Sequence, residues 1–214
     1  MRRGRFITFE GTEGSGKTSQ VRRAVEALAA RGLPVVATRE PGGTTLGEVL
    51  RSALLDPANH GMDPRAELLL YCADRAEHTT RVIAPALARG EVVICDRYGD
   101  ATVAYQGHGR ALGAELVRRT DLGRMAPDLT IVLDLPAALS LERAQARNQS
   151  QALDRESRFE QEALAFHERV RLGYLAIAAA EPERVKVVDA ARPPGEVFAE
   201  VLAHLLTVTR DLLP

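Results

Sequence analysis

Short runs of aliphatic and β-branched residues alternate along the chain with longer stretches whose apolar residues recur every three or four positions. The short runs are typical of strands buried on both faces of a parallel sheet, and the longer stretches are typical of amphipathic helices. Strands are expected over residues 5–9, 34–38, 91–95, 129–134 and 184–188. Helices are expected over residues 17–31, 45–55, 65–89, 112–124, 136–147, 157–180 and 195–211. The alternation predicts an α/β fold in which helices cover both faces of a parallel sheet.

One proline interrupts this pattern. Pro85 lies inside the longest expected helix and should kink or break it, because proline removes a helical hydrogen bond. No internal repeat, low-complexity tract or linker divides the 214 residues, so we expect a single domain over residues 1–214. In a parallel sheet the ligand lies at the carboxyl ends of the strands. The residues that follow each strand therefore carry the functional hypotheses.

Composition narrows the classes of function. A formal net charge of −1 gives no global basic field of the kind that nucleic-acid binding usually needs. No apolar stretch is long enough to span a membrane, and a strand expected from residue 5 argues against a signal peptide. Cys72 and Cys95 lie in apolar runs, so we expect buried, reduced thiols and not a disulfide or metal site. These features predict a cytoplasmic protein with neither a nucleic-acid nor a membrane partner.

A glycine-rich segment follows the first expected strand. The spacing Gly-x-x-x-x-Gly-Lys-Thr covers Gly11, Thr12, Glu13, Gly14, Ser15, Gly16, Lys17 and Thr18. A strand before it and an apolar helical stripe after it are the context in which this spacing predicts an ATP-binding phosphate loop, and they argue against a chance glycine-rich turn. The backbone N–H groups of such a loop and the helix N-terminus bind phosphate oxygens. Lys17 would reach the β- and γ-phosphates, and the Thr18 hydroxyl would hold Mg²⁺.

Charged residues follow two further strands. Asp96 and Arg97 come directly after the strand at 91–95; Asp96 is placed to orient Mg²⁺ through water, and Arg97 to fork onto a second phosphate. A local salt bridge between the two is the alternative, but the phosphate loop in the same sheet favours the functional interpretation. Arg39 follows the strand at 34–38 and precedes a turn into a helix that carries Arg51.

A polar, glycine-free segment near residue 150 contains Arg143, Arg147, Arg155 and Arg158. A solvated charged face is the commoner explanation for such a run. The alternative is a lid over about residues 147–158 whose arginines fold over transferring phosphates. The phosphate loop has no arginine at residues 12–15, so phosphoryl transfer would require one from elsewhere. Arg147, Arg143 and Arg155 all remain candidates.

Other uses of a phosphate loop are not supported. The Asn-Lys-x-Asp guanine motif of GTPases and the Leu-Ser-Gly-Gly-Gln signature of transporters do not occur in the sequence. Two arginine-bearing elements that can face phosphate, beside one phosphate loop, suggest two phosphorylated substrates. The sequence therefore favours a kinase that acts on a nucleotide.

Six segments resemble those of bacterial thymidylate kinases (dTMP kinases), which are P-loop nucleoside monophosphate kinases. They read FEGTEGSGKT, TREPGGTTLGE, LLLYCADRAEH, VVICDRYGDATVAYQG, PDLTIVLDL and DRESRFEQEALAFHERVRLGYL. The resemblance runs from residue 6 to about residue 190, and TREPGGT and DRY…AYQG are its most specific parts. It implies a P-loop kinase fold with a five-stranded parallel sheet and usually a homodimer. It also implies transfer of phosphate from Mg²⁺-ATP to dTMP, giving dTDP for dTTP synthesis.

The resemblance also implies roles around the phosphates. Glu10 would lie near the deoxyribose and the acceptor phosphate, which Arg97 and Arg51 would bind. Arg147 matches the lid arginine of the bacterial type. Lys17, Arg147, Glu10 and Arg97 are accordingly the expected catalytic residues.

A second set of roles concerns the base and sugar. By the same resemblance, Arg75 would bond the thymine edge and Tyr71 would stack on the base. Tyr105 would crowd the 2′ position of the sugar, and Thr102 and Gln106 lie close enough in the chain to contribute hydrogen bonds to the base. Without the resemblance, both tyrosines would be assigned to the core.

Some positions depart from the family pattern. The family more often has Phe at Tyr71 and usually has Ser at Ala101, and the expected lid is a few residues longer than usual. Two rival functions remain: a nucleoside monophosphate kinase for dUMP, CMP or AMP, and a non-catalytic ATP-binding switch. The spectrum of acceptors distinguishes the first rival, and the formation of ADP in proportion to added dTMP distinguishes the second.

Overall fold

A parallel sheet forms the centre of the molecule. The computed structural model describes residues 3–151 and 158–213, with side chains described for 3–146 and 158–213. The strands are β1 (Phe6–Glu10), β2 (Val35–Arg39), β3 (Val92–Asp96), β4 (Leu129–Asp134) and β5 (Val185–Asp189). They pair in parallel in the order β2-β3-β1-β4-β5. The five expected strands and the parallel sheet are confirmed, and four strands lie one residue further along than expected.

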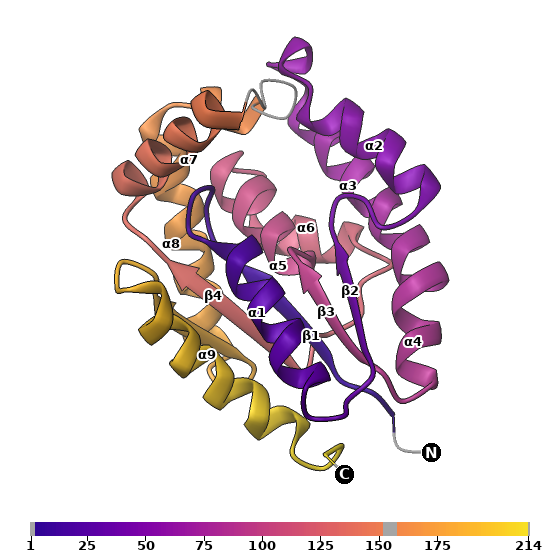
Figure 1. Ribbon diagram of the computed structural model, residues 1–214. Coiled ribbons are helices and arrows are strands. Elements are labelled where there is room, and N and C mark those ends of the chain that lie inside the picture. The colour runs from indigo at the N-terminus through magenta and orange to yellow at the C-terminus, as the bar shows by residue number, and fades with distance from the viewer. Residues whose placement is uncertain (1–2, 152–157, 214) are drawn as a thin grey trace.

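Helices cover both faces of this sheet (Figure 1). They are α1 (Lys17–Ala29), α2 (Thr45–Leu55), α3 (Pro64–His78), α4 (Ala84–Ala88), α5 (Gly99–Thr102), α6 (Ala114–Thr120), α7 (Ala137–Gln151), α8 (Leu164–Ala180) and α9 (Pro194–Thr209). Ile7 and Phe9 of β1 belong to a core shared with α1 and α9, whereas Phe6 packs with α4 on the other face. All five residues of β1 are buried, which explains its continuous apolar run.

Two expected helices are interrupted. Residues 65–89 form α3, a π-helical turn at Thr79–Ile83, and α4. The π-helical turn directly precedes Pro85, where a regular helix would place the ring against the carbonyl of residue 81, so the expected break is confirmed. In the second case, the described part of the helix expected over 157–180 forms a 3₁₀ turn at Arg158–Gln161 and then α8.

Residues 97–111 have no regular apolar period, and no helix was expected there. They contain α5 and a π-helical segment at Val103–Gly109. Gly109 lets this segment approach α8, since a Cβ there would lie 2.7 Å from the ring of Phe166. This contact depends on tertiary packing, so it gives no hydrophobic periodicity from which a helix could be predicted.

The start of the expected lid is also different from expectation. Helix α7 continues to Gln151, so residues 148–151 extend a helix that was expected to end at 147. Arg155 lies outside the described residues, as do the side chains of 147–151. Arg158, at the end of the expected lid, is fully buried.

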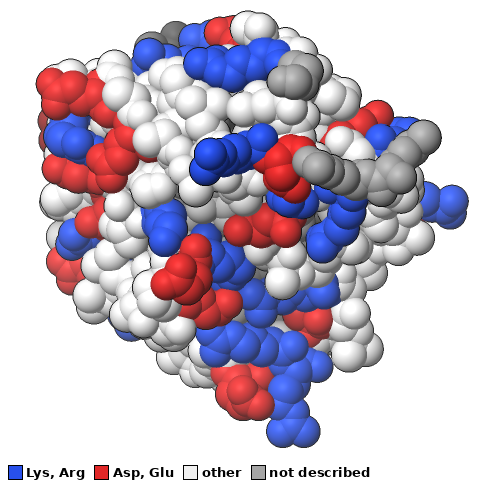
Figure 2. All heavy atoms as spheres, turned by 90° about the horizontal axis from the view of Figure 1, so that it is seen from below, with Lys and Arg blue, Asp and Glu red and all other residues white. Residues whose placement is uncertain are grey.

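The remaining expectations concern the surface and the cysteines. On the face seen from below, Lys and Arg side chains lie in groups beside Asp and Glu side chains, with uncharged areas between the groups (Figure 2). Both cysteines are free thiols; Cys95 is buried as expected, but Cys72 is only half-buried. Within residues 3–151 and 158–213, no helix has the length and apolarity that a membrane crossing requires.

Candidate active site

The phosphate loop lies between β1 and α1, at the carboxyl end of the central strand (Figure 1). Gly11, Gly14 and Gly16 have φ angles of 135°, 73° and 89°, a region that glycine enters without steric cost. At Gly14 a Cβ would also collide with the carbonyl oxygen of Ser140 in α7. Glycine is therefore needed there both for the loop to turn and for α7 to pack against it.

Lys17 is buried inside this loop. Its Nζ donates to the carbonyl oxygens of Gly11 at 2.9 Å and Thr12 at 2.7 Å. Burial, and then the positive charge of Arg97, lower the pKa of Lys17 to about 8. A buried ammonium held mainly by neutral carbonyl groups is suited to receive the negative charge of a phosphate.

Thr18 and Asp96 meet beside the loop. The Thr18 hydroxyl lies 3.4 Å from the Asp96 carboxylate, which brings the last residue of β3 to the first turn of α1. Both line an open cleft of about 670 Å³. Its other charged lining residues include Arg39, Arg51, Arg97 and Arg143. This is the cleft in which the sequence placed the triphosphate and its metal.

Two of these arginines are held by backbone oxygens. Arg51 Nη1 donates to the carbonyl of Pro41 at 3.0 Å, next to the cis peptide bond between Glu40 and Pro41. Arg143 Nη1 donates to the carbonyl of Ala190 at 3.3 Å. Arg51 therefore reaches the cleft from α2, and Arg143 reaches it from α7 on the other side of the phosphate loop.

Arg97 occupies the centre of the site in a strained backbone conformation, with a φ of 68°. Its Nη2 donates to Glu13 Oε1 at 2.9 Å, and its Nη1 donates to the Gly11 carbonyl at 3.0 Å and the Tyr174 hydroxyl at 3.3 Å. The alternative of a salt bridge with the adjacent Asp96 is therefore wrong. The ion-pair partner is Glu13, from the loop.

Glu13 faces the groups expected around the acceptor. Besides Arg97, it accepts a hydrogen bond from the Tyr105 hydroxyl at 2.7 Å. Burial opposes its ionisation, but Arg97, with help from His167 and Lys17, holds the pKa of Glu13 well below its usual range. The sequence assigned Glu13 to ATP through the loop spacing alone; its side chain contacts two residues assigned to dTMP.

A smaller cavity, of about 50 Å³, lies behind Arg97. It is lined by all five residues assigned to the base and sugar, which are Tyr71, Arg75, Thr102, Tyr105 and Gln106. Glu13 and Arg97 line both this cavity and the open cleft. The structure thus brings the two expected sets of residues together at one boundary.

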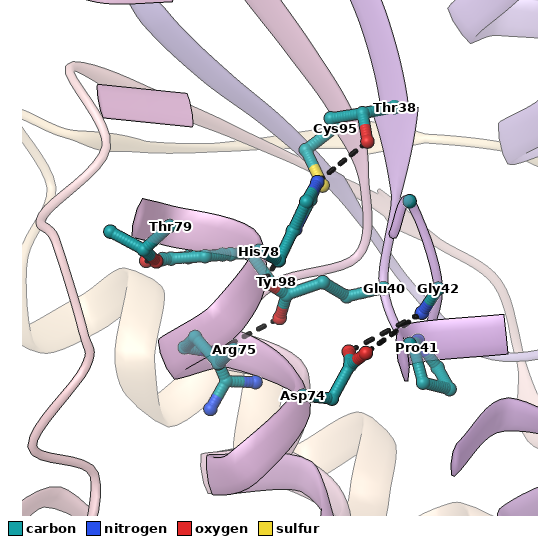
Figure 3. Close-up of polar contacts among 12 residues, drawn as sticks. Thr38, Glu40, Pro41, Gly42, Asp74, Arg75, His78, Thr79, Cys95 and Tyr98 are labelled. Carbon is teal, nitrogen blue, oxygen red and sulfur yellow. Dashed lines mark hydrogen bonds and ion pairs between the residues drawn. The ribbon is translucent and has the colours of Figure 1, made fainter. Parts of the chain in front are cut away.

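Arg75 is fixed by acidic groups that the sequence did not reveal. Its Nε donates to Glu40 at 3.0 Å (Figure 3). Its Nη1 donates to Asp121 at 2.8 Å, and its Nη2 donates to the Thr102 hydroxyl at 2.6 Å. Burial opposes the charge, but Glu40 and Asp121 raise the pKa of Arg75. The guanidinium is therefore a fixed, charged donor at the cavity wall.

A buried histidine supports Glu40 from behind (Figure 3). His78 Nδ1 lies 2.9 Å from Glu40 Oε1, and its Nε2 lies 2.6 Å from the Thr38 hydroxyl. Asp74, on the same helix, accepts from the Gly42 N–H at 3.2 Å. These contacts tie the turn after β2 to helix α3, which carries Arg75.

Only one end of the Gln106 side-chain amide is hydrogen-bonded to the protein. Its Nε2 donates to Glu67 Oε1 at 2.6 Å, whereas its buried Oε1 has no partner within the described part of the chain. An unpaired buried oxygen in a cavity wall is suited to accept from a ligand. Glu67 was not expected, because one carboxylate beside a run of three leucines in a helix with several other charged residues gives no sequence signal.

Glu10 lies beneath the phosphate loop and is completely buried. It accepts from the Tyr98 N–H at 2.8 Å and from the Tyr174 hydroxyl at 2.9 Å. Burial, and then the nearby Asp100, raise the pKa of Glu10 to about 8. Tyr174 connects Glu10 to Arg97 and was assigned no role from the sequence. Arg147, expected over the phosphates, lies in α7 with its side chain outside the described residues.

A cleft on the phosphate loop and a smaller cavity meet at Arg97 and Glu13, which line both spaces. With the parallel sheet, this arrangement defines a P-loop nucleotide kinase. The family model described as thymidylate kinase matches residues 9–201. The chain therefore belongs to the thymidylate kinase family. It phosphorylates dTMP to dTDP with ATP, a step in dTTP synthesis.

Individual relatives are similar to this protein over most of its length. It is 54% identical over 200 residues to a thymidylate kinase of Solidesulfovibrio magneticus, covering 92% of this chain and 96% of the relative. It is 53% identical over 189 residues to a thymidylate kinase of Geobacter sulfurreducens, covering 87% and 89% respectively. A crystal structure of thymidylate kinase from Ehrlichia chaffeensis matches with a TM-score of 0.75 and 34% identity, covering 95% of this chain and 99% of that one.

Proposed function

We propose that ATP with Mg²⁺ occupies the open cleft, that the base of dTMP enters the small cavity, and that the phosphoryl group passes from ATP to dTMP beside Arg97. The observation that carries this assignment is that Arg97 and Glu13 line both spaces. A guanidinium at the boundary can bind the acceptor phosphate and remain near the transferring group. The whole chain, residues 1–214, is taken as one P-loop kinase domain with both substrates on one sheet edge.

Donor binding is assigned to the loop and to Lys17. The N–H groups of residues 11–18 bind the phosphate oxygens, and the Lys17 ammonium leaves its carbonyl partners for the β- and γ-phosphates. The Thr18 hydroxyl and the Asp96 carboxylate, 3.4 Å apart, are oxygen ligands that fit Mg²⁺. Mg²⁺ bound there supplies positive charge to the triphosphate.

The transfer itself needs positioning more than base catalysis. The dTMP phosphate is a monoester that is largely ionised at neutral pH, so one of its oxygens can attack the γ-phosphorus as the bond to ADP breaks. Lys17 and Arg97 neutralise the charge that moves between the two phosphates. Arg51 supports the acceptor phosphate, and Arg147 is proposed as the arginine that covers the transferring group from α7. Glu10, with its raised pKa, adds little negative charge beside the phosphates at neutral pH.

The cavity wall has the polarity to recognise thymine. Three of the five N–H groups of Arg75 donate to protein, which leaves two for a carbonyl oxygen of the base. The free Oε1 of Gln106 can accept from the N3–H beside that carbonyl. Tyr71 is proposed to stack on the ring and Tyr105 to exclude a 2′-hydroxyl, with Thr102 holding Arg75.

We further propose that the enzyme is a homodimer that acts in the cytoplasm, where ATP and dTMP are available. Exposed apolar side chains on and next to three helices support the dimer. They are Val49 on α2, Leu69 on α3, Leu116 on α6 and Leu122 just after α6. Helix α3 contacts both α2 and α6, so these side chains belong to neighbouring elements. The molecular mass in solution tests the dimer.

The variant Arg97→Ala tests the boundary between the two sites. We expect the KM for dTMP to rise by at least tenfold while the KM for ATP changes much less, because loss of a charge-assisted phosphate contact costs roughly 1.5–3 kcal/mol. Initial rates with each substrate varied in turn measure both constants. Equal damage to both constants in a folded protein would place Arg97 outside the acceptor site.

A further inference from the structure

Glu67 is a fully buried carboxylate in α3 that lies behind the residues lining the small cavity. Its Oε1 accepts from Gln106 Nε2 at 2.6 Å and from Arg110 Nε at 3.1 Å. Its Oε2 accepts from Arg110 Nη2 at 3.1 Å and pairs with Arg158 Nη1 at 2.7 Å. One amide and two guanidinium groups thus meet on a single carboxylate: Gln106 and Arg110 come from the segment after α5, and Arg158 comes from the 3₁₀ turn before α8.

This arrangement fixes the direction of the Gln106 amide. A carboxylate between two guanidinium groups has no proton to donate, so only the NH₂ end of Gln106 can face it. The orientation of an amide is decided by its partners, and here the partner leaves no choice. The acceptor oxygen must then be the end that remains without a protein partner, which is Oε1.

We propose that Glu67 is a positioning residue that determines base specificity through Gln106, without touching either substrate. It holds the amide so that the cavity presents an acceptor at Gln106 beside a donor at Arg75. Thymine and uracil carry a matching N3–H beside a carbonyl, whereas cytosine carries a bare N3 beside an amino group. The proposal rests on the base contacts assigned above to Arg75 and Gln106.

The variant Glu67→Gln reverses this constraint. Two guanidinium donors, from Arg110 Nη2 and Arg158 Nη1, face the Oε2 position, whereas only Arg110 Nε faces the Oε1 position. The one remaining oxygen of residue 67 is therefore favoured at the Oε2 position, which turns its NH₂ group toward Gln106. The Gln106 amide then rotates to accept that hydrogen bond, and its own NH₂ group faces the cavity. This change favours cytosine and penalises thymine and uracil equally, because both have the same hydrogen-bonding edge.

The test compares kcat/KM for dTMP, dUMP and dCMP in the wild type and in Glu67→Gln. The dTMP-to-dCMP ratio is expected to fall roughly tenfold or more, while the dTMP-to-dUMP ratio and the KM for ATP stay constant. A merely structural role would not change the first ratio alone. Arg110→Met is the matched control: it removes a partner of Glu67 but leaves the carboxylate, so both ratios should hold.

The variant Gln106→Met tests the base contact assigned to Gln106 independently of the role proposed for Glu67. It should lower the dTMP-to-dCMP ratio by itself; if it does not, the assigned role of Gln106 fails, and the role of Glu67 fails with it. If Gln106→Met lowers the ratio and Glu67→Gln does not, only the role of Glu67 is overturned. Should Glu67→Gln not fold, Glu67→Gln/Arg110→Met, which removes one charge of each sign, is measured against the same criteria.

Discussion

Lys17 illustrates how strongly single residues in this site depend on their surroundings. Its ammonium is buried and donates to the carbonyl oxygens of its own loop at 2.9 and 2.7 Å. Burial and Arg97 lower its pKa to about 8, so the free enzyme loses this charge just above neutral pH. Bound triphosphate has the opposite effect, because negative charge favours the protonated amine.

The pH dependence of ATP use follows from this pKa. As pH rises through about 8, Lys17 of the free enzyme deprotonates, and kcat/KM for ATP is expected to fall. At saturating ATP and dTMP the bound phosphates keep the proton on Lys17, so kcat should persist to higher pH. Glu10 titrates in the same range, and Glu10→Gln is therefore the control, which should retain the fall. A flat kcat/KM for ATP from about pH 7 to about pH 9 would contradict the assignment.

The sequence predicted the residues of this site that belong to compact motifs. The loop spacing and the family resemblance named Lys17 and Arg75, and both line the expected spaces. Neither revealed the buried carboxylates that hold such residues, among them Glu40, Asp121 and Glu67. These lie at isolated positions, and their role arises only when the fold brings them to a partner far along the chain.

At the scale of elements, the phosphate loop packs tightly against α7. The backbone of Ser140 in α7 lies where a Cβ of Gly14 would be, and Ser140 Oγ donates to the Thr12 hydroxyl at 2.7 Å. Helix α7 also carries Arg143 into the cleft. The position of α7 relative to the loop therefore determines where Arg143 lies in the cleft.

Gly14→Ala tests this contact. The new methyl group should displace α7 and lower kcat by at least tenfold, together with a loss of stability. Gly113→Ala is the matched control, because Gly113 has a φ of 86° but a methyl group added there would have no neighbour within 4 Å. The control should lose roughly 1–3 kcal/mol of stability through its positive φ alone and keep its kcat. Thermal unfolding and steady-state rates measure both effects. Equal kcat values in the two variants would contradict the role of α7.

Elements differ in how well the sequence predicts them. The strands come from local β-branched runs, and each was placed to within one residue. The π-helical segments at Thr79–Ile83 and Val103–Gly109 were not predicted. A π-helical turn depends on packing around it, such as the approach of Gly109 to Phe166 in α8. A proline predicted the break after α3, but not the form that it takes.

At the scale of the whole molecule, the strand order explains where the site lies. Strand β1 is central, with β3 on one side and β4 on the other. The order of the strands reverses next to β1, so the loop after β1 lies at the switch point where parallel sheets bind their ligands. Glu10 ends that strand and is bonded by Tyr98, which follows β3, and Tyr174, from α8. Its burial therefore results from the assembly of the complete fold.

Burial of Glu10 makes stability depend on pH. Its pKa is raised from 4.5 to about 8 on folding, so between these values the native state holds a proton that the unfolded state has lost. The free energy of unfolding then decreases as pH rises through this window. Glu10→Gln cannot titrate, and its Tm relative to wild type should increase from about pH 5 to about pH 8. A Tm difference that is constant across this range would show that the folded pKa of Glu10 is not raised.

The central claim is that the small cavity recognises the N3–H and the adjacent carbonyl of thymine through Gln106 and Arg75. The most direct test is kcat/KM for dTMP, dUMP and dCMP with ATP, in the wild type and in Arg75→Lys. One methyl group in an apolar pocket gives dTMP a preference over dUMP of roughly 10- to 200-fold. We expect dCMP to fall far behind dUMP, because its amino group opposes the guanidinium N–H groups, and Arg75→Lys should narrow that gap. Phosphorylation of dCMP by the wild type as efficient as that of dTMP would contradict the claim.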